Sequence, residues 1–419
     1  MQELAVRAEP VCTGDFRRVL LLDPGLGPIP GHWATYARRL KAAFGELGLE
    51  VVLYGHRRQD RGIVGDLEIV PLFALTPYEP FGADPHDKPS ARAAFDAQQT
   101  RFAADLEKLE DYGIGPHDLL VFLTIYPQIL GGLIEWVRRK PQRRAQRVAV
   151  LMQFAENINV YEKARGATGD VYYIDYYRQI LPAGQGRDTY PHWRYFAAAP
   201  ELGDIFSTLM GKNVRTLPMP GSADWPPSRP RNGGKTVRIA VLGHTAIDKG
   251  AFLLSDIIFP TLGQFSYARF DFHLSTNPDT RALDAQFAAG SERLAIVRGY
   301  ISDSEMQGLI DNSDIVLMPY RPEKYRMMPS AIFVQAVCSG KVVVLPAGSH
   351  MHREILLRGG GAALFHDYTA TAIRKALWDA IADLDRLSAA AAAAAPAYRE
   401  VNNPHAYVKR IVEAFGPGG

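Results

Sequence analysis

The sequence predicts an α/β protein built from two doubly wound domains that face each other across a cleft. Three observations lead to this prediction. A buried strand, a glycine-containing turn, a helix and a second strand follow one another over residues 18–56, the same alternation returns over 118–154, and it starts again at 236 after a proline-rich stretch. Because 419 residues exceed the usual domain of roughly 100–200 residues, two domains are expected.

The first half contains the clearest elements. The apolar run 18–23 predicts a buried strand, and after the loop 24–31 apolar residues recur at helical spacing over 32–48, up to Gly48. A strand over 49–56 completes a parallel βαβ unit with a right-handed crossover. Further elements are expected in this order: strand 118–124, helix 128–140, strand 147–154, and a strand, a short helix and a strand within 195–221. A long helix over 90–113 lies among proline-rich residues.

The second half repeats this architecture. After a strand that starts at 236, strands are expected at 269–275, 294–299, 314–319 and 341–346, and helices at 303–312, 330–339 and 370–387. Ser302 and Glu305 form a capping box before the first of these helices. The alanine-rich stretch 388–400 favours a helix until Pro396 interrupts it, and a last helix is expected at about 404–415.

The composition change near residue 222 sets the predicted domain boundaries. Residues 1–220 form the N-terminal domain, 221–235 a linker with several prolines and glycines, and 236–395 the C-terminal domain, while 396–419 form a C-terminal helix that packs back on the N-terminal domain. Two such domains leave a cleft between their strand ends, where ligands of open α/β sheets usually bind.

Charge and cysteine content exclude several classes of protein. The formal net charge of +2 provides no strong field for a polyanion, so nucleic acid is not an expected partner. Cys12 and Cys338 are too few and too far apart in sequence for a disulfide framework or a zinc knuckle. Since no apolar run of about 18 residues and no signal peptide are evident, a cytoplasmic protein is expected.

Two glycine-containing loops are candidate ligand sites. The loop 24–32 lacks the G-x-G-x-x-G spacing of a dinucleotide site, but Gly27 and Gly31 would let an acceptor approach the backbone, with His32 near a helix start. The other interpretation is a turn that only connects two elements. After the strand at 236, Gly243, His244 and Lys249 stand where a helix start would bind an anion, and the alternative is a surface turn.

A third candidate is the start of the helix expected at Ser330. It follows a strand-end loop directly, so the amides of Ala331, Ile332 and Phe333 would have no partner within the helix. These groups would bind a diphosphate. No D-x-D pair in a suitable loop indicates a metal ion, and we expect neither a metal nor another cofactor.

The segment 298–346 resembles a known family. Its order of motifs, R-G-Y-I-S-D-S-E-M, then D-N-S-D-I-V-L-M-P-Y, then S-A-I-F-V-Q-A-V-C-S-G-K-V-V-V-L-P, is similar to the nucleotide-sugar-binding domain of GT-B glycosyltransferases, of the large group that includes family 4. The resemblance covers about 236–354 in several motifs of fixed order and extends to the N-terminal half only as architecture. It implies two Rossmann-like domains and transfer of a sugar from a nucleotide-diphosphate donor.

The resemblance assigns roles to residues of this chain. The family's G-R-x-x-x-x-K-G turn falls on Gly243 to Gly250, so Lys249 corresponds to the lysine that contacts the diphosphate, and His244 replaces the arginine. The family's two glutamates, separated by seven residues, fall on Met327 and Gln335, of which only Gln335 can still hydrogen-bond a ribose hydroxyl. The resemblance also places three side chains beside the donor, namely those of Tyr300, Tyr325 and Arg326.

The N-terminal half would bind and activate the acceptor. The candidate catalytic residues are His32, Asp23 and Glu156, and Gln153 would contact the acceptor. For Asp23 the alternative is a cap of the following turn, and for Glu156 a solvated loop carboxylate, and in both cases the alternative is favoured. The basic run within 136–147 would contact anionic lipid headgroups or, as the alternative, simply close a helix C-terminus with cations.

From the residues and the resemblance together, the expected activity is that of a metal-independent glycosyltransferase. It would transfer the sugar to a hydroxyl of a glycan, lipid-linked or protein acceptor, in bacterial surface-glycan assembly or protein glycosylation at the inner face of the membrane. Two alternatives stay open. One is a non-catalytic nucleotide-sugar-binding protein, because Met327, Gln335 and His244 depart from the family pattern, and the other is a sugar-nucleotide epimerase.

Overall fold

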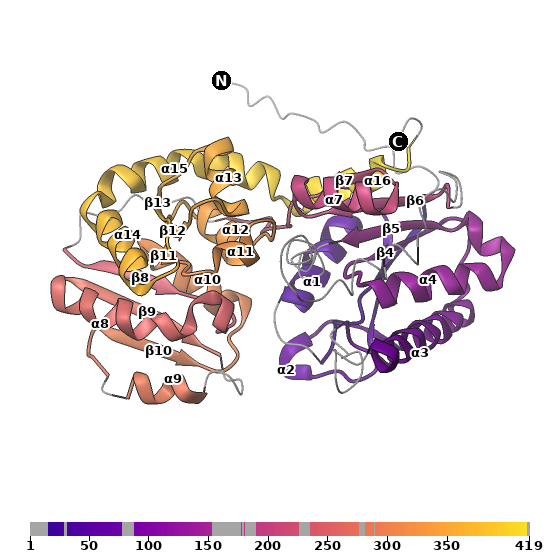
Figure 1. Ribbon diagram of the computed structural model, residues 1–419. Helices are drawn as coiled ribbons and strands as arrows, with labels where there is room; N and C mark the ends of the chain where they lie inside the picture. Colours follow the sequence, from indigo (N-terminus) through magenta and orange to yellow (C-terminus); the bar gives the residue numbers. More distant parts are fainter. Residues whose placement is uncertain are drawn as a thin grey trace, which may run out of the picture.

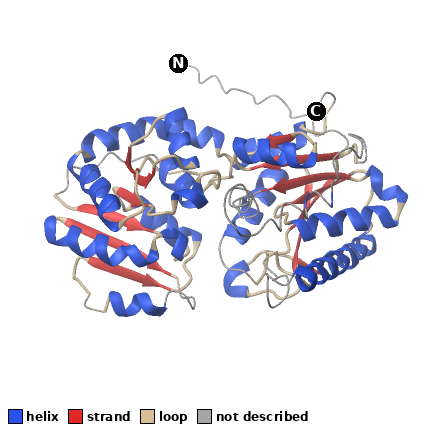
Figure 2. Cartoon of the chain, in the orientation of Figure 1, coloured by secondary structure: helices blue, strands red, loops and turns tan. Residues whose placement is uncertain are grey.

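The computed structural model describes residues 16–28, 32–77, 88–152, 177, 180, 190–225, 235–275, 281–288 and 290–416. These residues form two parallel β-sheets that lie side by side with helices around them (Figure 1, Figure 2). The strand orders are β3-β2-β1-β4-β5-β6-β7 and β10-β9-β8-β11-β12-β13. In each sheet the chain starts in the middle and winds outward to both edges, which confirms the predicted α/β architecture of two doubly wound domains.

The first sheet and its helices are built from residues 18–216. Its strands are β1 (Arg18–Leu22), β2 (Glu50–His56), β3 (Val70–Phe73), β4 (Asp118–Phe122), β5 (Arg147–Met152), β6 (Trp193–Ala197) and β7 (Val214–Thr216). Its helices are α1 (His32–Glu46), α2 (Arg61–Val64), α3 (Lys88–Glu107), α4 (Pro127–Arg139) and α7 (Pro200–Met210). Short 3-10 turns follow α3 at Lys108–Tyr112 and α4 at Pro141–Ala145. The sequence places most of these elements within two or three residues.

The strands of the first sheet are apolar on both faces because helices cover both. Leu20, Leu22 and Phe122 point to the face covered by α3 and α4, whereas Leu21 and Val121 point to the face covered by α1. This alternation follows from the two-residue period of a strand. The helix after β1 therefore lies on one face and the helix after β4 on the other, so the winding reverses between β1 and β4.

The second sheet starts at residue 237. Its strands are β8 (Val237–Val241), β9 (Ala268–Leu274), β10 (Leu294–Arg298), β11 (Ile315–Leu317), β12 (Val342–Pro346) and β13 (Ala362–Phe365). Its helices are α8 (Leu254–Gln264), α9 (Arg281–Gln286), α10 (Asp303–Asp311), α11 (Pro322–Tyr325), α12 (Ala331–Cys338), α13 (His350–Arg358), α14 (Ala370–Ala382) and α15 (Leu384–Val401). Two 3-10 turns, Ile247–Lys249 and Ala251–Leu253, precede α8. The capping box of Ser302 and Glu305 at the start of α10 is present as predicted.

Two expectations for the C-terminal helices are wrong. The helix expected over 370–387 is interrupted at Asp383, whose φ of −110° and ψ of 24° are not helical, and α15 starts at the next residue. Pro396 does not end α15, which continues to Val401. Proline removes only its own amide from the helical ladder, and the buried side chains of Ala395 and Tyr398 hold this turn in place. The structure also contains α13 and β13, which the sequence analysis missed.

The last helix, α16 (Pro404–Glu413), returns to the first sheet. It packs against α1, and its Tyr407, Val408 and Ile411 join the core on that face (Figure 1). A side-chain contact also joins the two halves: the Thr35 hydroxyl donates to the carboxylate of Asp303. One continuous cluster of buried apolar residues contains side chains from both sheets. None of the described helices combines the length and the apolar character needed to span a membrane.

Candidate functional site

The candidate site lies where the winding of the second sheet reverses. β8 pairs with β9 on one side and with β11 on the other, and the helices that follow β8 and β11 cover opposite faces of the sheet. The loops after these two strands therefore diverge, and ligands of doubly wound sheets bind in the crevice that this divergence leaves. The candidate donor residues lie in these loops and at the start of α12.

Two glycines shape the loop after β8. Gly243 has a φ of 97°, and a β-carbon there would lie 3.1 Å from Cγ1 of Ile332 and 3.7 Å from Nζ of Lys249. Gly250 has a φ of 73°, and a β-carbon there would clash with the carbonyl oxygen of Pro319. Since glycine adopts such φ angles without the strain that a side chain causes, both positions require it. The structure thus brings Gly243, Lys249 and Ile332 together.

A small pocket opens beside this loop. It is lined by Gly243, His244 and Lys249 on one side and by apolar side chains of the sheet on the other. Nζ of Lys249 lies 5.6 Å from the ring centre of Tyr320, which also lines the pocket. An ammonium beside apolar walls attracts an anion more strongly than one in open water, because the surroundings screen its charge less. This arrangement suits a phosphate group.

The start of α12 is only partly open. The hydroxyl of Ser330 accepts a hydrogen bond from the Phe333 amide at 3.3 Å, so the expectation that this amide is without a partner is wrong. Serine at an N-cap position normally takes the amide three residues on, and this explains the difference. Within the described part of the chain, the amides of Ala331 and Ile332 donate no such hydrogen bond. Two donors therefore stay available beside Gly243.

His244 stands at the exposed rim of the pocket. Its Nδ1 lies 3.1 Å from the hydroxyl of Ser275, which in turn accepts a hydrogen bond from the Thr245 amide at 2.7 Å. Partial loss of water around the ring and the nearby charge of Lys249 lower the pKa of His244 below its usual value. The imidazole is therefore neutral at neutral pH, and it does not supply the fixed charge that an arginine would.

The two donor residues predicted in the loop 319–330 differ in burial. Tyr325 is buried and its ring lies 4.4 Å from the ring of Tyr320, so it packs in the core. Burial raises the pKa of Tyr320 to about 12. Arg326 is exposed, and its carbonyl accepts a hydrogen bond from the guanidinium of Arg353. Met327 is only 4% exposed, which explains why an apolar side chain occupies this position.

Gln335 and Tyr300 lie in contrasting surroundings. Gln335 is 9% exposed on the inner face of α12, and its Oε1 has no hydrogen-bond partner among the described residues. A buried carbonyl oxygen of this kind is costly unless a partner is supplied. Tyr300 is 51% exposed in the loop after β10. No contact that the structure describes joins Tyr300 to Lys249 or to the start of α12.

In the N-terminal half, two of the candidate residues, Asp23 and Gly27, contact other parts of the protein itself. Asp23 is 2% exposed and accepts hydrogen bonds from the Gly25 amide at 2.8 Å and the Thr124 hydroxyl at 3.0 Å. Burial raises the pKa of Asp23 to about 7. At Gly27, with φ of 136°, a β-carbon would lie 2.6 Å from the carbonyl oxygen of Arg58, so the close approach here is to the protein's own backbone.

The other acceptor candidates are not placed. His32 begins α1, but its side chain is outside what the structure describes, and Gly31, Gln153 and Glu156 lie outside the described residues. Of the predicted acceptor residues, the structure describes Asp23 and Gly27, and neither of these two lines the pocket beside Lys249. Among the described residues, no group of three or more metal-binding side chains is close enough to hold a metal ion. The expectation of metal-independent chemistry stays a prediction.

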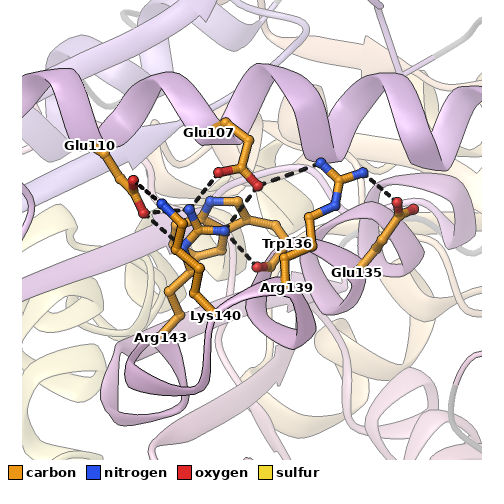
Figure 3. Close-up of polar contacts among 7 residues, drawn as sticks. All are labelled: Glu107, Glu110, Glu135, Trp136, Arg139, Lys140 and Arg143. Atoms are coloured by element: carbon orange, nitrogen blue, oxygen red, sulfur yellow. Dashed lines mark hydrogen bonds and ion pairs between the residues drawn. The ribbon is translucent and has the colours of Figure 1, made fainter.

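The basic run in 136–147 forms a network of ion pairs (Figure 3). Arg143 is buried, donates to Glu107 at 3.0 Å, to Glu110 at 3.1 Å and to the carbonyl of Trp136 at 2.7 Å, and stacks on the Trp136 ring. Arg139 pairs with Glu107 and Glu135, and Lys140 pairs with Glu110. Hydrogen bonds from Arg143 lower the pKa of Glu107, so its charge persists. Acidic partners thus take up much of this charge.

Solved structures with similar folds include glycosyltransferases. HepE from Anabaena, solved with UDP and glucose, is 11% identical, with a TM-score of 0.60 over 95% of this chain and 99% of that one. A glycosyltransferase from Rickettsia africae is 12% identical, with a TM-score of 0.62 over 96% and 98%. WaaG, a glycosyltransferase involved in lipopolysaccharide biosynthesis, is also 12% identical, with a TM-score of 0.60 over 96% and 100%. The chain has the GT-B fold.

Sequence comparison adds no family assignment to this fold. No family model matches the chain, and no curated protein sequence matches it. The GT-B fold predicted from the motifs of 298–346 is confirmed, whereas membership of the group around family 4 and the correspondence of Met327 and Gln335 to the family's glutamates stay predictions.

Sequence analysis missed residues whose role depends on tertiary contacts. Tyr320 lines the pocket beside Lys249, and His273 at the end of β9 lines the same pocket. Glu201 at the start of α7 forms an ion pair with Arg353 of α13, across the two halves. Tyr320 could have been found from its position directly after β11, at the strand end where ligands are expected. Nothing in the sequence relates residue 201 to residue 353.

Proposed function

We propose that this chain is a glycosyltransferase that moves a sugar from a nucleotide-diphosphate donor to a hydroxyl group of an acceptor. The observation that supports it best is the meeting of Gly243, Lys249 and the start of α12 at the point where the second sheet reverses its winding. Under this proposal the diphosphate lies between the ammonium of Lys249 and the amides of Ala331 and Ile332. HepE, a protein of similar fold, is solved with UDP-glucose.

The chemistry explains why such groups are needed. In sugar transfer, the bond between the anomeric carbon and the phosphate oxygen breaks while the acceptor oxygen bonds to that carbon and loses its proton. Negative charge builds up on the leaving diphosphate, so donors already aimed at it lower the barrier. Lys249 and the two amides supply such donors in this proposal, and Arg326 adds a second cation if its exposed side chain turns toward the pocket.

The acceptor side of the proposal rests on the N-terminal half. The acceptor would be a hydroxyl of a glycan, a lipid-linked sugar or a protein, in the assembly of bacterial surface glycans or in protein glycosylation. WaaG, whose fold is similar, takes part in lipopolysaccharide biosynthesis, which agrees with this setting. The proton of the acceptor hydroxyl needs a base, and His32, Asp23 and Glu156 remain the candidates of the proposal.

A non-catalytic nucleotide-sugar-binding protein is the second candidate function. It is favoured by Met327, which is buried in the core at the position where the sequence resemblance would place a glutamate that faces the donor sugar. A chain without that carboxylate could retain donor binding and lose transfer. A sugar-nucleotide epimerase, the third interpretation, would consume the donor without any acceptor and release an isomeric nucleotide sugar.

Titration calorimetry with UDP, GDP and their glucose and mannose derivatives tests the proposal first. Binding of at least one nucleotide sugar is expected, followed by turnover of that donor when glycan or lipid-linked acceptors are added. Since protein groups alone meet the charge in this proposal, EDTA should leave turnover unchanged. Binding without turnover by any acceptor favours the second candidate, and failure to bind every member of the panel contradicts both.

A further inference from the structure

One arginine contacts three segments of the chain at the junction of the two halves. Arg353 lies in α13, and its Nη1 donates to the carbonyl of Gly348 at 3.1 Å, in the loop after β12. Its Nη2 donates to the carbonyl of Arg326 in the loop 319–330, and its Nε pairs with the carboxylate of Glu201. All three nitrogens of the guanidinium are therefore engaged, each with a different segment.

Glu201 brings the N-terminal half into this arrangement. It lies in the first turn of α7, where the helix start favours a negative charge. Its second oxygen lies 3.8 Å from Nδ1 of His350, a buried side chain in the first turn of α13. The contacts with His350 and Arg353 lower the pKa of Glu201 to about 2, so the carboxylate is charged at any working pH. The ion pair with Arg353 therefore persists.

The contact with Arg326 has a consequence for the loop 319–330. This loop leads from β11 to the start of α12, and it carries Tyr320, which lines the pocket beside Lys249. Arg326 is an exposed residue, and its carbonyl is held by the guanidinium of Arg353. A residue that fixes this carbonyl also limits where the Arg326 side chain can reach.

We propose that Arg353 is a positioning residue that transmits the placement of Glu201, on the N-terminal half, to the loop 319–330 of the donor pocket. The proposal rests on the proposed function for the identity of the ligand, but the link between the three segments is independent of it. Arginine suits this role because its rigid guanidinium donates hydrogen bonds through Nη1 and Nη2 while Nε forms the ion pair with Glu201, whereas a lysine ammonium at the same place reaches fewer partners. Glu201 and Arg353 are thus expected to act as one unit.

Hydrogen–deuterium exchange on the full chain tests the link without any ligand. Arg353→Gln removes the charge and the fork, and Glu201→Gln removes only the carboxylate on the other half. Both should raise the exchange rate of amides in peptides that cover 320–328, by about tenfold, the factor that matches the loss of one charge-assisted hydrogen bond. Arg353→Lys should give an intermediate rate. Peptides from α8, remote from the junction, serve as the internal reference.

Arg358→Gln provides the matched control. Arg358 lies on the same helix and pairs with Glu354, and among the described residues no hydrogen bond or ion pair joins either side chain to the loop 319–330 or to the N-terminal half. It should leave the exchange of 320–328 at the wild-type rate. If Glu201→Gln also leaves it unchanged, the link between the halves is wrong, and if Arg353→Gln leaves it unchanged, Arg353 does not position the loop.

Binding of UDP and turnover of UDP-glucose separate this inference from the proposed function. If the wild-type chain turns over UDP-glucose, Glu201→Gln should lower kcat about tenfold while the dissociation constant of UDP changes less than threefold, because Glu201 does not touch the pocket. A residue with a merely structural role would lower the melting temperature and leave kcat of the folded protein unchanged. Faster loop exchange in a chain that binds no nucleotide would refute the proposed function alone.

Discussion

The backbone of Gly243 packs directly against the side chain of Ile332, the second residue of α12. A β-carbon at Gly243 would lie 3.1 Å from Cγ1 of Ile332, tighter than ordinary contact. The positive φ of Gly243 adds a second obstacle to any side chain. The loop after β8 and the helix start after β11 therefore approach each other only because residue 243 is glycine.

Gly243→Ala should weaken binding of UDP by tenfold or more. The methyl group would push the loop away from the start of α12 and strain the backbone, so Lys249 and the amide of Ile332 would no longer converge on one diphosphate. Calorimetric titration measures the effect. Gly263→Ala in α8 is the control, because a β-carbon there meets nothing within 4 Å, and its affinity for UDP should equal that of the wild type.

Lys249→Ala should weaken binding of UDP by about 10–100-fold, the range expected for one hydrogen bond to a charged group. Uridine, which lacks the diphosphate, should bind the variant and the wild type equally. Salt should reduce the affinity of the wild type for UDP more than that of the variant, since part of the attraction is electrostatic. Lys375→Ala removes an exposed lysine of α14 as the control. Unchanged affinity for UDP in Lys249→Ala would remove this lysine from the site.

The sequence predicts the two sheets well because their signals are local. Apolar runs flanked by glycine and proline identify strands such as β1, β4 and β12, and the order in which strands and helices alternate implies the doubly wound topology. The Gly243–Lys249 turn and the start of α12 at Ser330 are also local patterns. The turn lines the pocket, and the start of α12 lies beside Gly243, because the fold brings the ends of β8 and β11 together.

The rest of the site depends on contacts between distant residues. The amide of Phe333 is taken by Ser330, and the Gly27 backbone approaches Arg58, for reasons of packing that spacing in the sequence does not reveal. The pairing of Glu201 with Arg353 joins residues about 150 positions apart. Pro396 misled the helix prediction because the packing of Tyr398 outweighs one lost hydrogen bond.

Asp23→Asn should make the protein more stable at pH 8 than the wild type. The pKa of Asp23 is about 7 in the folded protein and 3.8 in the unfolded chain. Between about pH 4 and 7 the unfolded chain loses this proton while the folded protein keeps it, so the free energy of unfolding of the wild type falls over this range and stays low above pH 7. Asparagine keeps an acceptor for the Gly25 amide and carries no charge. The gain at pH 8 should be on the order of 1–4 kcal/mol and should disappear near pH 4.

Thermal unfolding at pH 4, 6 and 8 measures the change in stability of Asp23→Asn, and a turnover assay measures its kcat. If Asp23 only caps the turn, Asp23→Asn should keep the kcat of the wild type. A large fall in kcat with unchanged folding would restore Asp23 as the acceptor base. A melting temperature that responds to pH equally in variant and wild type would contradict the raised pKa.

Arg143→Met should lower the free energy of unfolding by about 2–3 kcal/mol. The guanidinium is 4% exposed and neutralises two glutamates, so its removal leaves Glu107 and Glu110 close together without their shared partner. The loss stays below that of a fully buried pair because both glutamates keep some contact with water. Arg386→Met, at an exposed pair with Asp383, is the control and should cost less than about 1 kcal/mol. Urea denaturation measures both.

The same ion-pair network determines which cations of 136–147 are available to bind anionic lipid. Arg139, Lys140 and Arg143 are paired with glutamates, so the attraction to anionic lipid should come from the exposed Arg138 and Arg144. With vesicles of phosphatidylcholine and phosphatidylglycerol, the double change Arg138→Gln and Arg144→Gln should reduce binding about 30-fold, at about 1 kcal/mol for each charge. Vesicles of phosphatidylcholine alone should bind neither protein. Equal binding of the double variant and the wild type to the anionic vesicles would show that this surface does not contact lipid. The other cations of the run already have an acidic or aromatic partner, so they could not take over the role of Arg138 and Arg144.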